Sequence, residues 1–140
     1  FGWEKIKTLG DGYLCVGGVP TPTTDHPVQV INAALEILAF LEEWKNECIL
    51  KNEIYFEGRV GIHTGPLIAG VVGKSKFAFD IWGDTVNIAA RMESSGAVGR
   101  INISKSTYQL VETRFDFAYR GKIPIKNQEP IDMYFLVAAK

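Results

Sequence analysis

The chain has 140 residues, of which 46% are hydrophobic and 22% are charged. These values are typical of one ordinary globular domain over residues 1–140, with enough chain to form a core. The formal net charge of −1 gives no electrostatic reason to expect nucleic acid or an anionic membrane as a partner. A phosphate-binding site in this chain would therefore need a local cluster of basic side chains.

The cysteines and the most apolar stretch of the chain indicate the cellular compartment in which we expect the domain. Cys15 and Cys48 are far apart and lie outside any Cys-x-x-Cys pattern, which argues against a metal site. Two separate thiols fit a reducing compartment, and we expect a cytoplasmic domain. Residues 28–41 contain three polar side chains and indicate an amphipathic helix, so we expect no membrane contact by this domain. Because the chain begins at Phe1 without a methionine, we expect it to be part of a longer protein.

The N-terminal residues predict a β-hairpin. Residues 4–9 alternate as a half-buried strand does, the Gly-Asp-Gly of residues 10–12 is a turn signal, and residues 13–16 resume a strand. An Asp at position 11 of such a turn can simply bond to neighbouring amides, and Lys7 can simply be solvated. The pattern alone therefore assigns no function to either residue.

A loop and a helix follow the hairpin. Residues 17–27 are rich in glycine and proline, which predicts a loop. Residues 28–48 place apolar side chains at helical spacing, and acidic residues crowd the C-terminal end of the stretch. We expect a helix that covers the core and carries no chemistry.

The glycine-rich segment at residues 57–73 predicts two strands separated at Gly65-Pro66. Its glycine spacing differs from that of a Walker loop, and the Gly-Lys-Ser/Thr ending is missing. His63 lies in this segment. A lone histidine on a glycine-rich strand is more often structural than catalytic, so we assign it no role in chemistry.

Residues 77–94 contain the most informative pattern. Gly83 ends an aromatic-rich run, and Asp84 has the position of an N-cap for a helix that starts at Thr85. Apolar side chains spread over most of the circumference of this helix, which predicts that it is mostly buried. One polar strip remains, formed at positions i, i+4 and i+7 by Asn87, Arg91 and Ser94. A buried guanidinium needs a partner, and the pattern allows either an internal carboxylate or a ligand.

The remaining residues predict a short strand at 100–104 and a helix at 105–113 that Ser104 caps. Two further strands are predicted at residues 115–119 and 131–138. Residues 121–126 begin their connection, which ends in Lys126. A solvated lysine is the simplest interpretation of Lys126 from the pattern alone.

Residues 79–94 (Phe-Asp-Ile-Trp-Gly-Asp-Thr-Val-Asn-Ile-Ala-Ala-Arg-Met-Glu-Ser) resemble the signature of the class III nucleotidyl cyclases. The hairpin at residues 4–13 and the Arg-Val-Gly-Ile-His segment at residues 59–63 are similar to other segments of that family. The resemblance implies an α+β, ferredoxin-like sandwich, in which helices pack on an antiparallel sheet. It also implies that Asn87 and Arg91 contact the nucleotide in the transition state.

The resemblance implies that Lys7 and Asp80 select the base. In guanylate-selective members the corresponding positions are typically Glu and a small residue such as Cys. Adenine offers an acceptor at N1 and a donor at its 6-amino group, which match a lysine donor and an aspartate acceptor. We therefore expect an adenylate cyclase that acts on ATP. The alternatives are a guanylate cyclase and an inactive nucleotide-binding or dimerisation module.

The resemblance also implies a metal site, a phosphate contact and a partner. Two Mg²⁺ or Mn²⁺ ions are expected, with Asp11 as one ligand, and Lys126 is expected at the terminal phosphates. The family's other metal-binding Asp belongs to a Phe-x-Asp-Ile-x-Gly-Phe motif that precedes the hairpin and is not identifiable here. By motif order the chain thus corresponds to roughly the later three-quarters of the catalytic domain, without the first strand and the helices after it. We expect a homodimer with active sites at its two-fold interface.

Overall fold

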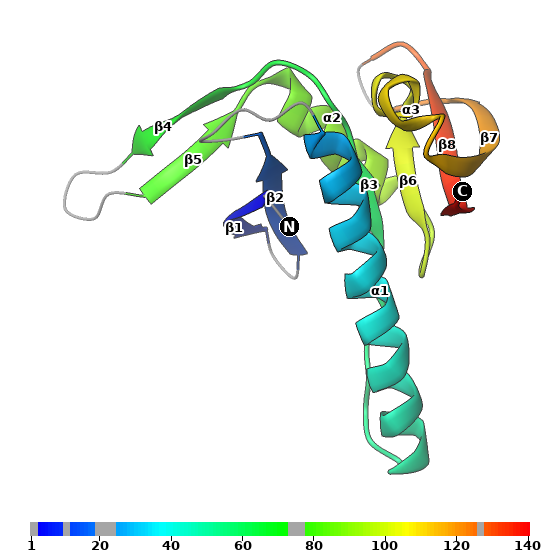
Figure 1. Ribbon diagram of the computed structural model, residues 1–140. Helices are drawn as coiled ribbons and strands as arrows, with labels where there is room; N and C mark the ends of the chain where they lie inside the picture. Colours follow the sequence, from blue (N-terminus) through cyan, green and yellow to red (C-terminus); the bar gives the residue numbers. More distant parts are fainter. Residues whose placement is uncertain (1–2, 10–11, 19–24, 73–77, 126–127) are drawn as a thin grey trace.

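The computed structural model describes residues 3–9, 12–18, 25–72, 78–125 and 128–140, with the backbone alone at residues 3–9, 71–72, 78–79 and 82. The elements are, in chain order, β1 (Trp3–Leu9), β2 (Gly12–Gly17), α1 (His26–Leu50), β3 (Val60–Ile62), β4 (Ile68–Val72), β5 (Ala78–Trp82), α2 (Asp84–Ser94), β6 (Ile101–Ser104), α3 (Lys105–Val111), β7 (Phe115–Ile123) and β8 (Ile131–Ala139). Figure 1 shows their arrangement.

The central sheet of the described residues has four strands in the order β3-β6-β8-β7. Strands β6, β8 and β7 pair antiparallel, whereas β3 and β6 pair in parallel. Strands β1 and β2 form a separate antiparallel hairpin, and β4 and β5 form another. The predicted α+β fold is confirmed, and its sheet is mixed because the chain returns through α2 before it enters β6.

Strand β6 separates two layers of helix packing. Ile101 and Ile103 are buried in the cluster that also contains Ile31 of α1. Asn102 lies between them in sequence and contacts Met92 of α2 instead. Because successive strand side chains point to opposite faces, α1 and α2 pack on opposite faces of the central sheet.

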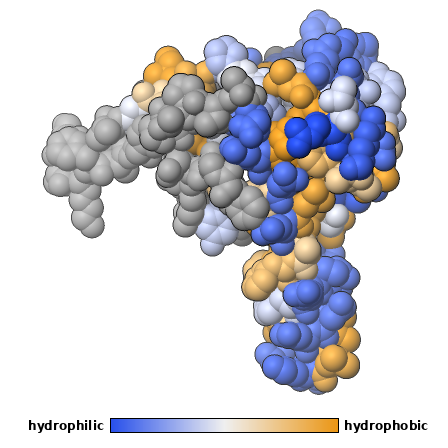
Figure 2. All heavy atoms as spheres, in the orientation of Figure 1, coloured by the Kyte–Doolittle hydropathy of each residue, from blue (hydrophilic) through white to orange (hydrophobic). Residues whose placement is uncertain are grey.

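Helix α1 extends well beyond the sheet, and the chain after it returns along its side (Figure 1). The predicted helix at residues 28–48 is confirmed, with Pro27 in its first turn. Trp44 of the helix packs on Phe56 of the returning chain, with ring centroids 4.8 Å apart. The end of this projection is mostly hydrophilic with a few hydrophobic side chains (Figure 2).

The start of α2 differs from the prediction. The helix begins at Asp84, and Gly83 is its N-cap with φ of 131°. Only glycine adopts this φ readily, so Gly83 makes the turn into the helix. Asp84, predicted to be the N-cap, lies in the first turn, where its carboxylate interacts favourably with the positive end of the helix dipole.

Two further boundaries differ from the prediction. Helix α3 ends at Val111 rather than near residue 113, and β7 continues to Ile123 rather than stopping at residue 119. The pairing of β7 with β8 shifts register between Tyr119 and Gly121. Such an irregularity interrupts the apolar alternation that marks a strand in sequence, which is why the prediction stopped there.

Candidate active site on helix α2

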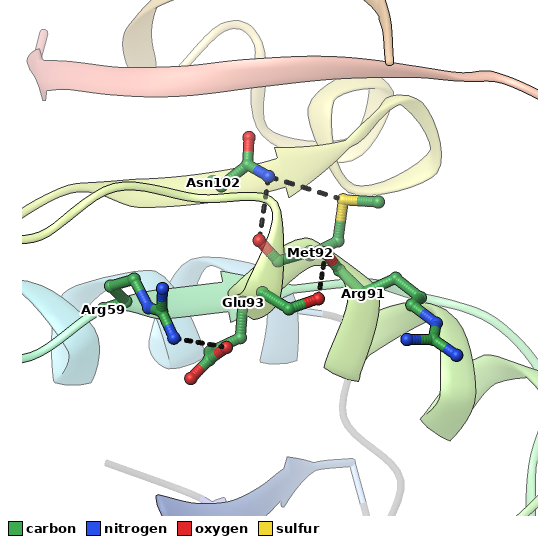
Figure 3. A network of polar contacts seen from close by, with 6 residues as sticks. Arg59, Arg91, Met92, Glu93 and Asn102 are labelled. Atoms are coloured by element: carbon green, nitrogen blue, oxygen red, sulfur yellow. Dashed lines mark hydrogen bonds and ion pairs between the residues drawn. The ribbon is translucent and has the colours of Figure 1, made fainter. Parts of the chain in front are cut away.

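Helix α2 presents its polar strip to solvent. Asn87, Arg91 and Ser94 are exposed, whereas Met92 is completely buried. The prediction of a mostly buried helix is therefore wrong: among the described residues, only one side of α2 meets other elements. The side chain of Arg91 points away from Met92 and Asn102 in Figure 3. A guanidinium and an amide are thus available on one open face.

The Arg91 guanidinium has no internal carboxylate partner within the part of the chain that the structure describes. A charged pair on α2 joins Arg59 to Glu93, with 3.6 Å between Nη2 and Oε2 (Figure 3). Of the two alternatives that the sequence leaves open, the internal ion pair is therefore not found among these residues. An exposed guanidinium on a rigid helix is suited to bind an anionic ligand.

Close packing against strand β3 holds α2 in place. A β-carbon on Gly61 would lie 2.0 Å from the backbone nitrogen of Glu93 and 2.5 Å from the carbonyl carbon of Met92. Only glycine allows this approach of strand and helix backbones. On the sheet side of the helix, the buried Asn102 amide donates from Nδ2 to the Met92 carbonyl at 2.9 Å (Figure 3).

Asp80 lies on β5 and is opposite Gly70 of β4. Its side chain is half-buried, and its Oδ1 accepts a hydrogen bond of 2.8 Å from the Ile81 backbone amide. Strand β5 also contacts strand β1, which carries Lys7. The side chain of Lys7 lies outside the described part of the structure, but the backbone brings together the two strands that carry the predicted base-selecting residues.

Asp11 and Lys126, predicted at the metal and the terminal phosphates, lie outside the described residues. The neighbours of Lys126 in the chain are informative. Ile125 is buried in the cluster that contains Met92 of α2, and Gln128 Nε2 donates to Asp84 Oδ1 at 3.4 Å. The chain therefore contacts α2 on both sides of residues 126–127.

The described residues do not form a metal site by themselves. No three His, Cys, Asp or Glu side chains gather in the described part of the chain in a way that would hold an ion. Asp11 therefore stays a predicted ligand. Among the helices that are described, none has the length and hydrophobicity needed to cross a bilayer.

His63 belongs to a polar cluster beside this site. Its Nδ1 lies 2.5 Å from Ser104 Oγ and 3.2 Å from Ser106 Oγ, and Ser106 Oγ donates to the Thr64 carbonyl at 3.0 Å. Burial lowers the pKa of the His63 imidazole below its usual value, and nearby Asp84 opposes this shift. The cluster links the end of β3 to the start of α3, as expected for a structural histidine.

Asn102 and Arg120 are two residues at this site that sequence reasoning missed. Both bind the C-terminal end of α2: Asn102 donates a hydrogen bond to the Met92 carbonyl, and Arg120 Nη1 donates one of 2.9 Å to the Ser95 carbonyl. A signal for Asn102 was present: a lone amide between two isoleucines, in a short strand. No comparable signal marks Arg120, because an arginine on a β-strand is usually solvated.

An α+β fold with a solvent-facing asparagine and arginine on one helix, beside a strand pair that carries an aspartate, defines a domain suited to bind an anionic ligand. The comparisons with known proteins identify it further. The family model described as the adenylate and guanylate cyclase catalytic domain matches residues 1–138, so the chain belongs to that family.

Among curated relatives, an adenylate cyclase of Mycobacterium tuberculosis is 38% identical over 139 residues, which cover 99% of this chain and 30% of that protein. The guanylate cyclase soluble subunit beta-2 of Rattus norvegicus is 39% identical over 134 residues, 95% of this chain and 19% of that protein. The chain thus spans less than a third of either relative. These relatives divide between the two nucleotide specificities.

The solved guanylate cyclase domain of RhGC from Catenaria anguillulae, in complex with GTP, superposes with a TM-score of 0.86 at 33% identity. The match covers 99% of this chain and 74% of that one. The structure of this chain therefore has the α+β fold of the cyclase family to which its sequence belongs. The fold does not distinguish the two nucleotide specificities.

Proposed function

We propose that this chain forms part of the catalytic domain of an adenylate cyclase, which converts ATP to 3′,5′-cyclic AMP and pyrophosphate. The choice of ATP comes from the side-chain types at Lys7 and Asp80, and the observation that supports treating them as a pair is the contact between strand β1, which bears Lys7, and strand β5, which bears Asp80. Both residues lie on neighbouring strands of one subunit, as a pair that reads a single base requires.

The chemistry of the pair favours adenine. A lysine ammonium can only donate hydrogen bonds and suits N1 of adenine, whereas an ionised aspartate can only accept them and suits the 6-amino group. Guanine presents a donor at N1 and an acceptor at O6. In the same arrangement the lysine donor would face the N1 donor, and the aspartate acceptor would face the O6 acceptor. The hydrogen bond from the Ile81 amide to Asp80 Oδ1 holds the carboxylate in one orientation and occupies part of its acceptor capacity.

The reaction is an intramolecular phosphoryl transfer. The ribose 3′-oxygen forms a bond to the α-phosphorus, the bond from that phosphorus to the bridging oxygen breaks, pyrophosphate leaves, and the 3′-hydroxyl proton passes to solvent or a base. Arg91 neutralises charge that develops around the α-phosphate, and Asn87 orients the ribose. One fixed donor of this kind contributes about 10²–10³ in rate.

The family's divalent ions would lower the pKa of the 3′-hydroxyl and stabilise the attacking and leaving oxygens. In this chain Asp11 is the residue proposed to hold them, and Lys126 is proposed to bind the terminal phosphates. The contacts of Ile125 and Gln128 with α2 support a role at the site for the chain segment that carries Lys126.

The proposed partner is a second copy of the same domain. Arg91 and Asn87 are open within one chain, which fits a site that another subunit completes. A C2 homodimer would contain two equivalent sites, because each copy would supply both sets of residues.

The test is a product assay with the full-length protein, at equal concentrations of ATP and GTP and with Mg²⁺ or Mn²⁺. Cyclic AMP as the main product supports the proposal, and an excess of cyclic GMP would refute the specificity. A protein that binds nucleotide but forms neither product would be a binding or dimerisation module. The 140-residue chain assayed in parallel shows whether these residues suffice.

A guanylate cyclase is the second candidate. It is favoured by the identity of 39% to the guanylate cyclase soluble subunit beta-2 of Rattus norvegicus, which is as high as the identity to the mycobacterial adenylate cyclase. Overall identity reflects the shared fold, however, whereas two side chains at the base decide the specificity. The same product assay separates the candidates.

A further inference from the structure

The C-terminal end of α2 is held by side chains from the central sheet. The last carbonyls of a helix have no partner within the helix. The Ser95 amide bonds to the Arg91 carbonyl at 2.9 Å, but the Gly96 amide bonds to Glu93 at 3.0 Å rather than to Met92. The Met92 carbonyl receives its hydrogen bond from Asn102 Nδ2 at 2.9 Å (Figure 3).

Arg120 of β7 binds the carbonyl of Ser95, the C-cap residue of α2. Its Nη1 donates to the Ser95 carbonyl at 2.9 Å and to Asn102 Oδ1 at 3.1 Å. The guanidinium also lies over the Phe135 ring, 4.0 Å from the ring centroid, which restricts its orientation. Asn102 and Arg120 therefore form a connected pair in which each side chain binds one carbonyl at the end of α2.

The buried position of Asn102 makes the pair rigid. The residue is completely buried, and its amide uses both ends: Nδ2 donates to Met92 and lies 3.2 Å from Met133 Sδ, while Oδ1 accepts from Arg120. A satisfied polar network in a dry core permits one arrangement, because any shift leaves a buried group without its partner. Movement of α2 along its axis would break both carbonyl contacts.

We propose that Asn102 and Arg120 are positioning residues that fix α2 so that Arg91 meets the transition state. Met92 follows Arg91 in the chain and points to a different side of the helix. A hydrogen bond to the Met92 carbonyl therefore fixes the position of α2 along its axis and its rotation about that axis, and with them the position of Arg91. The inference rests on the proposed cyclase function. Loss of the pair should lower kcat far more than it changes KM, because Arg91 acts on charge that appears in the transition state.

The test is Asn102→Asp in the full-length protein. The aspartate keeps the side-chain shape and an acceptor for Arg120, but places an oxygen against the Met92 carbonyl in place of the donor. We expect kcat to fall about 10–100-fold, since displacements of about 1 Å have effects of this order, and KM to stay within about twofold. Hydrogen–deuterium exchange of the amides in residues 88–96 should become faster.

The matched control is Ile103→Val, a buried change on the same strand whose side chain joins the cluster with α1 rather than α2. It should leave kcat and the exchange of residues 88–96 at wild-type values. If Asn102→Asp does not fold, Arg120→Lys at the half-buried partner provides the same two measurements, because lysine lacks the planar guanidinium that stacks on Phe135 while Nη1 donates to the two oxygens.

Unchanged exchange of residues 88–96 in the folded variant would overturn the inference, as would faster exchange with a wild-type kcat. A fall in kcat shared by Ile103→Val would also overturn it, since the effect would then be general destabilisation. A wild-type protein that forms no cyclic nucleotide would instead refute the proposed function, and the exchange measurement would still decide whether Asn102 holds α2.

Discussion

Gly61 of β3 faces the backbone of Glu93 in α2 at a distance that leaves no room for a β-carbon, which would lie 2.0 Å from the Glu93 nitrogen. Because both groups belong to backbones, neither can move aside as a flexible side chain would. Gly61→Ala should lower the free energy of unfolding by at least about 1–3 kcal/mol, as overpacked cores do. Urea denaturation measures this change.

Gly58→Ala is the control for this substitution. A β-carbon there would lie 3.0 Å from the end of the Leu41 side chain, which can move aside. Its unfolding free energy should stay near that of the wild type. Equal effects of the two substitutions would show that the approach of α2 to β3 is not what demands glycine at position 61.

Arg91→Ala should remove turnover without unfolding the protein. The side chain is exposed and has no ion-pair partner among the described residues, so its loss leaves no buried group unsatisfied. We expect kcat to fall about 10²–10³-fold, the contribution of one preorganised donor, with a thermal midpoint close to wild type. Steady-state kinetics and thermal unfolding measure the two quantities.

Arg59→Ala provides the matched control, because Arg59 is also exposed and its ion-pair partner among the described residues is Glu93, on the far side from Arg91 (Figure 3). An exposed ion pair contributes little to stability, and its removal should leave kcat unchanged. If Arg91→Ala turns over at near the wild-type rate, Arg91 does not act in the transition state.

Nucleotide preference should change when both base-selecting residues are replaced. Lys7→Glu with Asp80→Cys exchanges a donor–acceptor pair for the pattern that suits guanine. The ratio of kcat/KM for GTP to that for ATP should rise at least about tenfold, which corresponds to about 1.4 kcal/mol. Lys51→Glu, a charge reversal just after α1, should leave the ratio at its wild-type value. An unchanged ratio in the double variant would contradict the assignment of the pair.

The stability of the protein should depend on pH through His63. Burial lowers the pKa of this imidazole in the folded state below its usual value of 6.5. The unfolded chain therefore binds the proton first, and stability falls as the pH drops through about 6.5 toward the lower folded pKa, by at most about 1.4 kcal/mol per pH unit. Urea denaturation at several pH values measures this slope.

His63→Gln should flatten the slope in that pH range, because glutamine can keep a hydrogen bond to Ser104 and does not titrate. The variant and the wild type should be closest in stability near neutral pH and diverge as the solution becomes more acidic, because only the wild type loses stability through protonation of this side chain. Identical slopes would assign the pH dependence to other groups.

Much of the fold could be predicted from local pattern. The hairpin of β1 and β2, the long helix α1 and the strands on both sides of Gly65-Pro66 follow from alternation, helical spacing and turn residues. The N-cap of α2 was misplaced by one residue, because Asp84 and Gly83 are both acceptable caps in sequence and only the φ of Gly83 distinguishes them.

The site was only partly predictable. Asn87 and Arg91 stand out because a helix with apolar residues on most sides leaves them in one strip, and the structure places both on the open face. Whether Arg91 had an internal partner could not be read from spacing, because that depends on which carboxylates the fold brings near. Lys7, Asp11 and Lys126 stay predictions, since the described residues do not include their side chains.

By itself, the sequence determined the elements, the family and the residue types at the site, because periodicity, turn chemistry and motif spacing are local properties of the chain. Only the tertiary structure decided that Gly61 must admit the backbone of α2, that Asn102 and Arg120 bind the end of that helix, and that Arg91 faces solvent. These relationships join residues that are distant in sequence, and they arise from the packing of α2 on the sheet, which no local pattern encodes.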